Sequence, residues 1–266
     1  MNNKIHAIHI SDIDSLWLLE RLKRLDLLRG FCAWWWEGAP SFEVVCGALL
    51  VQNSRWEGVQ ASIKNLKNAR ILSDNDDEES LSNLAKCTNI ESLITPSGLF
   101  RQKSARLITL ANAIITDFGD FSNFRDEVSR EWLLSQKGIG KESADSILNY
   151  ACGREIMVVD RYSYKLLCAL GIEIEDYEEL QGWFMDLDLG GAFGLYEGFC
   201  EDFGGVCGAF ATGDGTGANG SVGGGTNSNK KGANPQISLA QIYARYHGKI
   251  LEFSKRKMNI NTLIAQ

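Results

Sequence analysis

Apolar residues recur every three or four positions along most of the chain, and polar residues fill the positions between them. This spacing places the apolar side chains on one face of a helix. Only 3 prolines interrupt the pattern, and there is little of the alternation typical of strands. The helical pattern covers residues 16–27, 42–50, 63–67, 80–85, 103–118 and 238–253. The sequence therefore predicts an all-α protein.

The most informative segment is residues 131–151, where two short helical patterns are joined by Gly138-Ile139-Gly140. The glycines let the backbone turn tightly and approach a ligand closely, and Ile139 can fill the space between the helices. Exposed amides at the start of the second helix, with Lys137 and Lys141 beside them, suit a DNA phosphate. The segment indicates a helix-hairpin-helix motif, although an ordinary contact between two helices has a similar pattern.

Asp160 lies twenty residues after Gly140, between an apolar run and a helical segment. On its own, a carboxylate in this position can simply cap the helix. The pairing of the hairpin with a downstream aspartate is much more specific than either feature alone.

These segments resemble the HhH-GPD superfamily of base-excision DNA glycosylases. Its endonuclease III branch carries L-P-G-V-G-x-K-T-A followed by V-D-T-H, and the matching stretches are residues 136–144 (QKGIGKESA) and 159–162 (VDRY). Residues 96–105 (PSGLFRQKSA) are similar to the family's turn and helix before the hairpin. The resemblance implies that Asp160 is the catalytic carboxylate. It also implies DNA-backbone contacts from Lys137, Gly138, Gly140 and Lys141.

By the resemblance, we expect two helical lobes with an active-site cleft between them. Residues 41–154 would form a six-helix lobe that contains the hairpin. Residues 1–40 and 155–266 would form the second lobe from both ends of the chain, with Asp160 at the mouth of the cleft. Residues 201–235 are rich in glycine and poor in apolar side chains, so we expect a flexible insertion there.

Glu142 departs from the family pattern in a way that changes the chemistry. The lyase members carry a lysine at this position, and its amine attacks the sugar to form a Schiff base. A glutamate cannot do this, and Lys141 would point about 100° away on the helix. The resemblance therefore implies a monofunctional enzyme that uses water. Asp160 would stabilise the positive charge that develops on the sugar and would orient or deprotonate that water.

Cysteine spacing argues against an iron–sulfur cluster. The cluster-bearing relatives have cysteines at spacings x6, x2 and x5, and four thiolates are needed. Cys200 and Cys207 reproduce the first spacing, but Phe210 and Thr216 occupy the next two ligand positions. We expect no cofactor, and we leave open whether main-chain carbonyls of the hairpin hold a monovalent cation.

Aromatic residues near the N-terminus point to the base. Trp34, Trp35 and Trp36 cannot all face one core from a helix, and Trp56 follows residues 51–55 (VQNSR). Core packing would account for one or two of these rings, whereas a ring that lines the cleft would stack on a flipped base. Alkylated purines such as 3-methyladenine are cationic while attached to the sugar. An indole face attracts such a cation by roughly 1–2 kcal/mol when water is excluded.

Residues 33–57 and 238–255 are similar to the endonuclease III-like bacterial branch of 3-methyladenine DNA glycosylases. In that branch a tryptophan of the run and an aromatic residue after the Q-N pair sandwich the base, which maps onto Trp35 and Trp56. Gln52 would fill the space left by the flipped base, or else make a buried polar contact. Other candidates for the base pocket are Trp36, Glu142 and Lys249.

Two departures from that branch leave the exact substrate range open. Trp56 stands where phenylalanine is common, and Glu37 stands where proline is common after the tryptophan run. The net charge of −7 is no obstacle to DNA binding, because two acidic runs, residues 74–79 and 173–179, carry ten negative charges. Without them 27 basic and 24 acidic residues remain. Such runs are usually solvated faces or loops, so the remaining surface can be basic.

The sequence as a whole predicts a monofunctional DNA glycosylase that flips out and hydrolytically excises alkylated purines, chiefly 3-methyladenine, from double-stranded DNA. Seven scattered cysteines, no signal-peptide pattern and no long apolar run predict a cytoplasmic protein without membrane contact. We expect a monomer. Two alternatives stay open: a bifunctional glycosylase and lyase for oxidised pyrimidines, and a non-catalytic helix-hairpin-helix DNA-binding protein.

Overall fold

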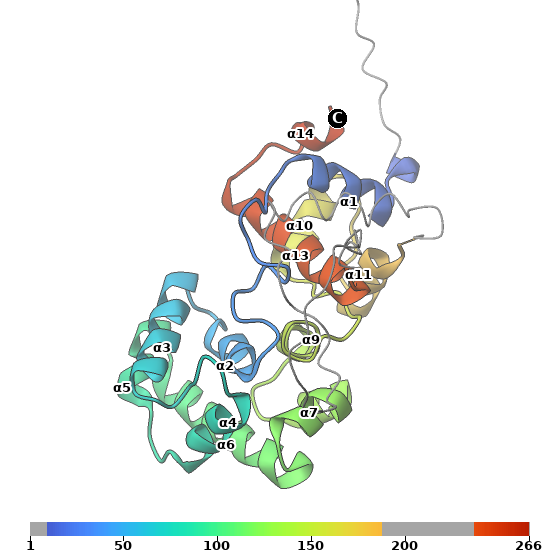
Figure 1. Cartoon of the computed structure of the whole chain (residues 1–266). Coiled ribbons are helices and arrows are strands. Elements are labelled where there is room, and N and C mark those ends of the chain that lie inside the picture. The colour runs from blue at the N-terminus through green and yellow to red at the C-terminus, as the bar shows by residue number, and fades with distance from the viewer. Residues whose placement is uncertain (1–9, 188–236, 266) are drawn as a thin grey trace, which may run out of the picture.

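The computed structural model describes residues 10–187 and 237–265. Within these ranges the chain consists of helices, turns and loops, without a strand, which confirms the all-α prediction. The glycine-rich insertion predicted at residues 201–235 and the cysteine pattern that begins at Cys200 lie outside the described residues. Figure 1 shows two helical bodies, with α9 (Lys141–Ser146) placed between them.

The body that precedes α9 in the chain is built on one continuous apolar core. Its core combines residues from every α-helix between Phe42 and Leu133 with residues of the segment that follows α9. The elements are α2 (Phe42–Leu50), α3 (Trp56–Asn68), α4 (Asp77–Lys86), α5 (Glu91–Ile94), η2 (Thr95–Ser97), α6 (Phe100–Phe118), α7 (Phe121–Glu127) and α8 (Arg130–Ser135). After α9 the chain continues in a π-helical turn, η3 (Ile147–Ala151).

The other body has its own core, to which both ends of the described chain contribute. Its elements are η1 (Ile10–Asp12), α1 (Ser15–Arg24), α10 (Arg161–Ala169), α11 (Tyr177–Met185), α13 (Leu239–Lys255) and α14 (Asn261–Ile264). Residues 157–159 connect the bodies, and Val158 packs into one core while Met157 and Val159 pack into the other. Asp160, the next residue, is thereby fixed at the junction of the two bodies.

The carboxylates of the two acidic runs do more than face solvent. Asp76 accepts the amide of Glu79 and caps α4, and Asp176 caps α11 in the same way. Glu78 accepts the amides of Phe121 and Ser122 at the start of α7. Negative groups are favourable at helix N-termini because the first amides there lack partners within the helix. Several carboxylates of the two acidic runs therefore stabilise helix N-termini.

A buried lysine fixes the loop between α2 and α3. Lys103 is 1% exposed, and its ammonium donates to Leu50 O and Ser97 O, both at 2.8 Å, and to Ser54 Oγ at 2.6 Å. Burial, together with the charge of Arg106, lowers the pKa of Lys103 to about 8. These bonds join the loop that carries Gln52 to the η2 turn, so the loop has a defined position relative to the hairpin.

Candidate active site and DNA-binding hairpin

Asp160 uses its two carboxylate oxygens differently. Oδ1 caps α10, because it accepts the amides of Tyr162 at 2.8 Å and Ser163 at 2.9 Å. Oδ2 faces His247 of α13, and the distance from Oδ2 to His247 Nε2 is 3.6 Å. The helix-cap interpretation and the catalytic interpretation are therefore compatible, because capping occupies one oxygen and leaves the other for chemistry.

The surroundings of Asp160 keep it ionised. The side chain is 9% exposed, and burial by itself would raise its pKa. Interaction with His247 and the hydrogen bonds from the Ser163 and Tyr162 amides outweigh burial, so the pKa of Asp160 lies below its ordinary value. A buried carboxylate that stays negative is suited to stabilise a cation that develops on a bound sugar.

Glu142 belongs to the same electrostatic cluster as Asp160. It is the second residue of α9, and its side chain remains accessible to solvent. Partial enclosure by the protein and the negative charge of Asp160 both raise the pKa of Glu142. The hairpin helix therefore presents a carboxyl group, and not an amine, toward the Asp160 region.

The tryptophan run is placed by close packing against two glycines. Trp35 has a positive φ of 63°, and a Cβ atom at Gly248 of α13 would lie 2.4 Å from its ring. Trp36 packs on α2, where a Cβ atom at Gly47 would lie 2.8 Å from its ring. The left-handed turn at Trp35 sends the two indoles in different directions, so they contact different helices.

Trp36 contacts both of the other predicted rings of the aromatic cluster. Its ring meets those of Trp35 and Trp56 at 87° in both cases, with centroid distances of 6.5 Å and 5.2 Å. Its centroid is also 5.2 Å from that of Tyr150. Trp35 and Trp56 are half-buried, whereas Trp36 is 8% exposed. The structure thus brings the three predicted aromatic residues into one cluster, with Trp36 as its inner member.

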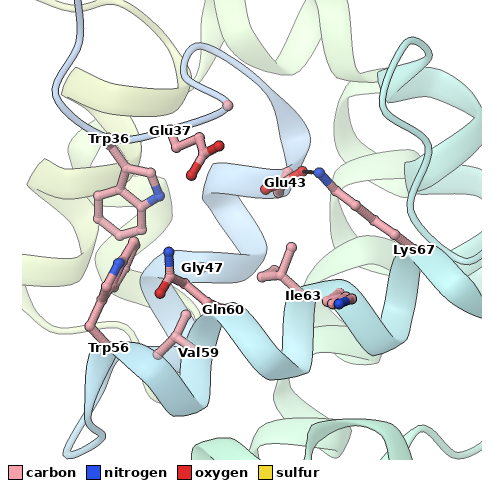
Figure 2. A pocket seen from close by; sticks show the side chains of 11 residues that line it. Trp36, Glu37, Glu43, Gly47, Trp56, Val59, Gln60, Ile63 and Lys67 are labelled. Atoms are coloured by element: carbon pink, nitrogen blue, oxygen red, sulfur yellow. Dashed lines mark ion pairs between the residues drawn. The ribbon is translucent and has the colours of Figure 1, made fainter. Parts of the chain in front are cut away.

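A pocket of about 360 Å³ opens beside Trp36 and Trp56, between α2 and α3. Figure 2 shows both indoles at one end of this pocket and the ion pair of Glu43 with Lys67 at the other. Glu37, the residue where the related branch commonly has proline, also lines the pocket. The aromatic walls suit a planar base, whose positive charge an indole face attracts. The charged side chains of the lining are balanced, with Glu37 and Glu43 against Lys64 and Lys67.

The hairpin follows the geometry expected from its glycines. Gly138 has a φ of 88°, and a Cβ atom there would lie 2.3 Å from Arg106 Nε. Arg106 NH1 in turn donates to Gln52 Oε1 at 3.3 Å. Gln52 Nε2 donates to Gly138 O and to Ser143 Oγ, both at 2.9 Å. The sequence left two roles open for Gln52, which were to fill the space of a flipped base or to make a buried polar contact. In this structure Gln52 makes a polar contact, which links the hairpin to the loop before α3.

The other hairpin residues proposed to bind DNA are exposed. Gly140 is the N-cap residue of α9 and supplies no side chain to the first amides of that helix. Lys141 is paired with Glu178, which lies in the second acidic run, and Glu178 Oε1 is also 3.6 Å from Arg130 NH1. A phosphate that binds Lys141 would compete with Glu178 for this ammonium. The spacing of residues in the sequence did not reveal this pairing.

Substitution of Gly138 by alanine is expected to destabilise the hairpin. An alanine would have to adopt a left-handed backbone and displace Arg106, so we expect a loss of about 1–3 kcal/mol in the free energy of unfolding. Denaturant unfolding measures this loss. Gly140→Ala is the matched control for stability, because Gly140 has an ordinary φ of −98° and open space around its Cβ position. Equal losses in the two variants would contradict the packing argument.

Two functional candidates were not distinguished by the sequence. His247 was not among the residues that the sequence placed at the site, yet it is 6% exposed and faces Asp160. Tyr150 was not singled out at all, yet its hydroxyl lies 2.6 Å from His247 Nδ1. Lys249, the residue preferred for a pocket-side role, is completely buried in α13. Only the fold brings α13 against η3, since 97 residues separate Tyr150 from His247.

Two further features are absent from the described ranges. No group of three or more histidine, cysteine, aspartate or glutamate side chains is arranged to hold a metal ion there. In the same residues, no helix combines the length and the apolar character needed to cross a bilayer.

Comparison with known proteins identifies the family. The model of the HhH-GPD superfamily of base excision DNA repair proteins matches residues 46–185, which is more than half of the chain. A protein of Methanocaldococcus jannaschii whose description assigns it to the DNA repair glycosylases is 35% identical over 161 residues, which cover 56% of this chain and 69% of that protein. The chain belongs to the HhH-GPD superfamily.

A solved structure narrows the comparison within the superfamily. The crystal structure of H. pylori 3-methyladenine DNA glycosylase (MagIII) bound to 1,N6-ethenoadenine is similar to this chain with a TM-score of 0.76 and 46% identity. The match covers 93% of this chain and all of the H. pylori chain. These findings confirm the family and the fold class that the sequence predicted.

Proposed function

We propose that this chain is a DNA glycosylase that excises alkylated purines, chiefly 3-methyladenine, by hydrolysis during base excision repair. The observation that carries the proposal is Asp160, whose Oδ2 is free of capping bonds at the junction of the two bodies. Support comes from the aromatic cluster of Trp35, Trp36 and Trp56. The similarity to the H. pylori enzyme, which extends over nearly the whole chain, supports the substrate class.

In the proposed reaction the damaged base leaves the duplex and stacks between Trp35 and Trp56, with Trp36 behind it. Stacking favours a cationic base, and the positive charge on that base already weakens its bond to the sugar. As the bond breaks, Asp160 stabilises the oxocarbenium charge and orients a water molecule, or takes its proton, for attack on the sugar. The products are a free base and an abasic site in an intact strand.

DNA binding is assigned to the hairpin and its surroundings. Lys137, Gly138, Gly140 and Lys141 would contact the phosphate backbone, which positions the duplex without reading its sequence. Leu99 is a further candidate for DNA contact, because its apolar side chain is 54% exposed. It follows the η2 turn, which Lys103 links to the loop that carries Gln52. An exposed apolar side chain next to a DNA-binding surface suits contact with unstacked bases.

The absence of lyase chemistry is a separate, testable part of the proposal. No amine occupies the Glu142 position, so we expect duplex DNA carrying 3-methyladenine to lose its base while the strand stays whole until alkali is added. Gel electrophoresis with and without alkali, and borohydride trapping of a covalent adduct, measure this directly. Strand cleavage without alkali, or a trapped adduct, would favour the bifunctional alternative. Release of bases from DNA with oxidised pyrimidines, and not from methylated DNA, would also favour the bifunctional alternative.

A further inference from the structure

Tyr150, His247 and Asp160 form a buried chain of polar groups that leads to the proposed catalytic carboxylate. The Tyr150 hydroxyl lies 2.6 Å from His247 Nδ1, and His247 Nε2 lies 3.6 Å from Asp160 Oδ2. The three residues come from η3, α13 and the start of α10, so elements of both bodies contribute. Tyr150 and His247 are 0% and 6% exposed.

The hydrogen-bond partners determine which ring nitrogen of His247 carries the proton. The Tyr150 hydroxyl has two acceptors within reach, His247 Nδ1 at 2.6 Å and Ala244 O at 3.4 Å. Asp160 Oδ2, which Nε2 faces, is a carboxylate oxygen and can only accept. The neutral tautomer that suits both neighbours therefore accepts from the Tyr150 hydroxyl at Nδ1 and carries its hydrogen on Nε2. That N–H group then faces the Asp160 carboxylate.

Nε2 of His247 is buried and, among the described residues, has no partner at ordinary hydrogen-bond distance. Buried polar atoms nearly always have a partner, because an unpaired one loses its solvation without compensation. Asp160 Oδ2, at 3.6 Å, is the acceptor that Nε2 faces. Hydrogen bonds between catalytic groups are often long in free enzymes and shorten when the substrate binds. An apolar side chain could fill the same space, so packing alone does not account for a nitrogen at this position.

We propose that His247 is a positioning residue for Asp160: held by the Tyr150 hydroxyl, its Nε2–H group fixes Oδ2 in place and keeps the carboxylate ionised. This role rests on the proposed glycosylase function, because it acts through Asp160. His247 itself contacts neither base nor sugar in this scheme. A carboxylate oxygen accepts more than one hydrogen bond, so Oδ2 can face both His247 and a water molecule.

The charged groups around Asp160 define the expected pH dependence. Glu142 of α9 adds negative charge, Arg161 of α10 adds positive charge at the surface, and His247 of α13 is the closest cationic or donor group. Burial raises the pKa of Asp160, and His247 contributes most to lowering it again. Excision requires the ionised carboxylate. Loss of the His247 contact must therefore move the acid limb of the rate profile to higher pH.

The test compares single-turnover rates of 3-methyladenine release between about pH 4 and 8 in full-length variants. Tyr150→Phe frees the imidazole from its hydroxyl partner, and His247→Leu removes the donor. Both should shift the acid limb upward, by about 1 pH unit for His247→Leu. His247→Gln, which can place an amide N–H near the Nε2 position, should restore part of the shift. Tyr246→Phe is the matched control, because it removes a buried hydroxyl on α13 that bonds Ser15 O instead.

A second measurement does not depend on activity. The chain has 3 histidines, so long-range proton–nitrogen NMR can resolve the tautomer of His247, assigned by comparison with His247→Gln. We expect the Nε2–H form, with an Nε2 signal that moves in Asp160→Asn. A uniform rate loss with an unchanged acid limb, or an Nδ1–H tautomer insensitive to Asp160→Asn, would overturn the positioning role. If the wild-type protein releases no base, the proposed function fails while the NMR result still decides whether His247 engages Asp160.

Discussion

Replacement of Asp160 by asparagine will lower the single-turnover rate of base release by about 10²–10⁴-fold. The asparagine side chain keeps an oxygen at the Oδ1 position, so it can still accept the Tyr162 and Ser163 amides that begin α10. It has no negative charge to offer an oxocarbenium ion and cannot take a proton from water. The substitution therefore separates the structural use of Asp160 from its chemical use.

The measurement is release of 3-methyladenine from methylated duplex DNA with enzyme in excess. Thermal unfolding and affinity for a duplex that contains an abasic-site analogue should stay near the wild-type values. Asp176→Asn is the matched control, because Asp176 caps α11 through the Glu179 amide and is not part of the Asp160 cluster. A wild-type rate in Asp160→Asn would remove Asp160 from the reaction, and a similar loss in Asp176→Asn would point to damage to the fold.

Local sequence patterns were sufficient to locate the hairpin and Asp160. Gly138 and Gly140 marked the hairpin because a positive φ and a close approach of Arg106 require glycine at the first of them. Asp160 was found by its distance from Gly140. The long apolar stripes gave α1, α4 and α6, which each bury one face, and also α2 and α13, which are buried on most sides. The short helices α5 and α7 were missed, since four and seven residues contain too few turns to show a period.

The contacts that refine the site are long-range, and no local pattern encodes them. The Gln52 amide reaches a carbonyl 86 residues away, and His247 reaches Tyr150 across 97 residues. Tyr150 lies in the π-helical turn that follows α9 and ends the second hairpin helix. An extra residue in the turn changes which side chains face inward, so α-helical spacing could not place Tyr150. Such insertions are common at functional sites, which agrees with the chain of contacts from Tyr150 to Asp160.

The net charge of −7 bears on the proposed DNA binding through the places where the acidic residues lie. Several acidic residues are used as helix caps or ion-pair partners, and Glu178 is placed directly beside the hairpin lysine Lys141. A carboxylate in this position occupies the ammonium until a phosphate replaces it. In the proposed function, the hairpin therefore contributes less free energy to non-specific DNA binding than its lysines alone would suggest. Recognition then depends more on the flipped base and on the aromatic cluster of Trp35, Trp36 and Trp56.

Substitution of Trp56 by alanine is expected to reduce excision of 3-methyladenine by about 30- to 5,000-fold. Stacking on an aromatic ring contributes about 1–3 kcal/mol per base, and the cation–π attraction adds about 1–2 kcal/mol. Trp56→Phe should retain most of the activity, because a phenyl ring still covers one face of the base. Affinity for abasic-site DNA should not change, since that ligand has no base to stack.

Trp17→Ala provides the matched control for this substitution. Trp17 is a partly buried tryptophan of α1 in the other body, where it packs against Arg21 with 4.3 Å from the guanidinium carbon to the ring centroid. Its loss should leave excision intact. Unchanged excision of 3-methyladenine in Trp56→Ala would exclude Trp56 from the base pocket, and a similar loss in Trp17→Ala would point to damage to the fold.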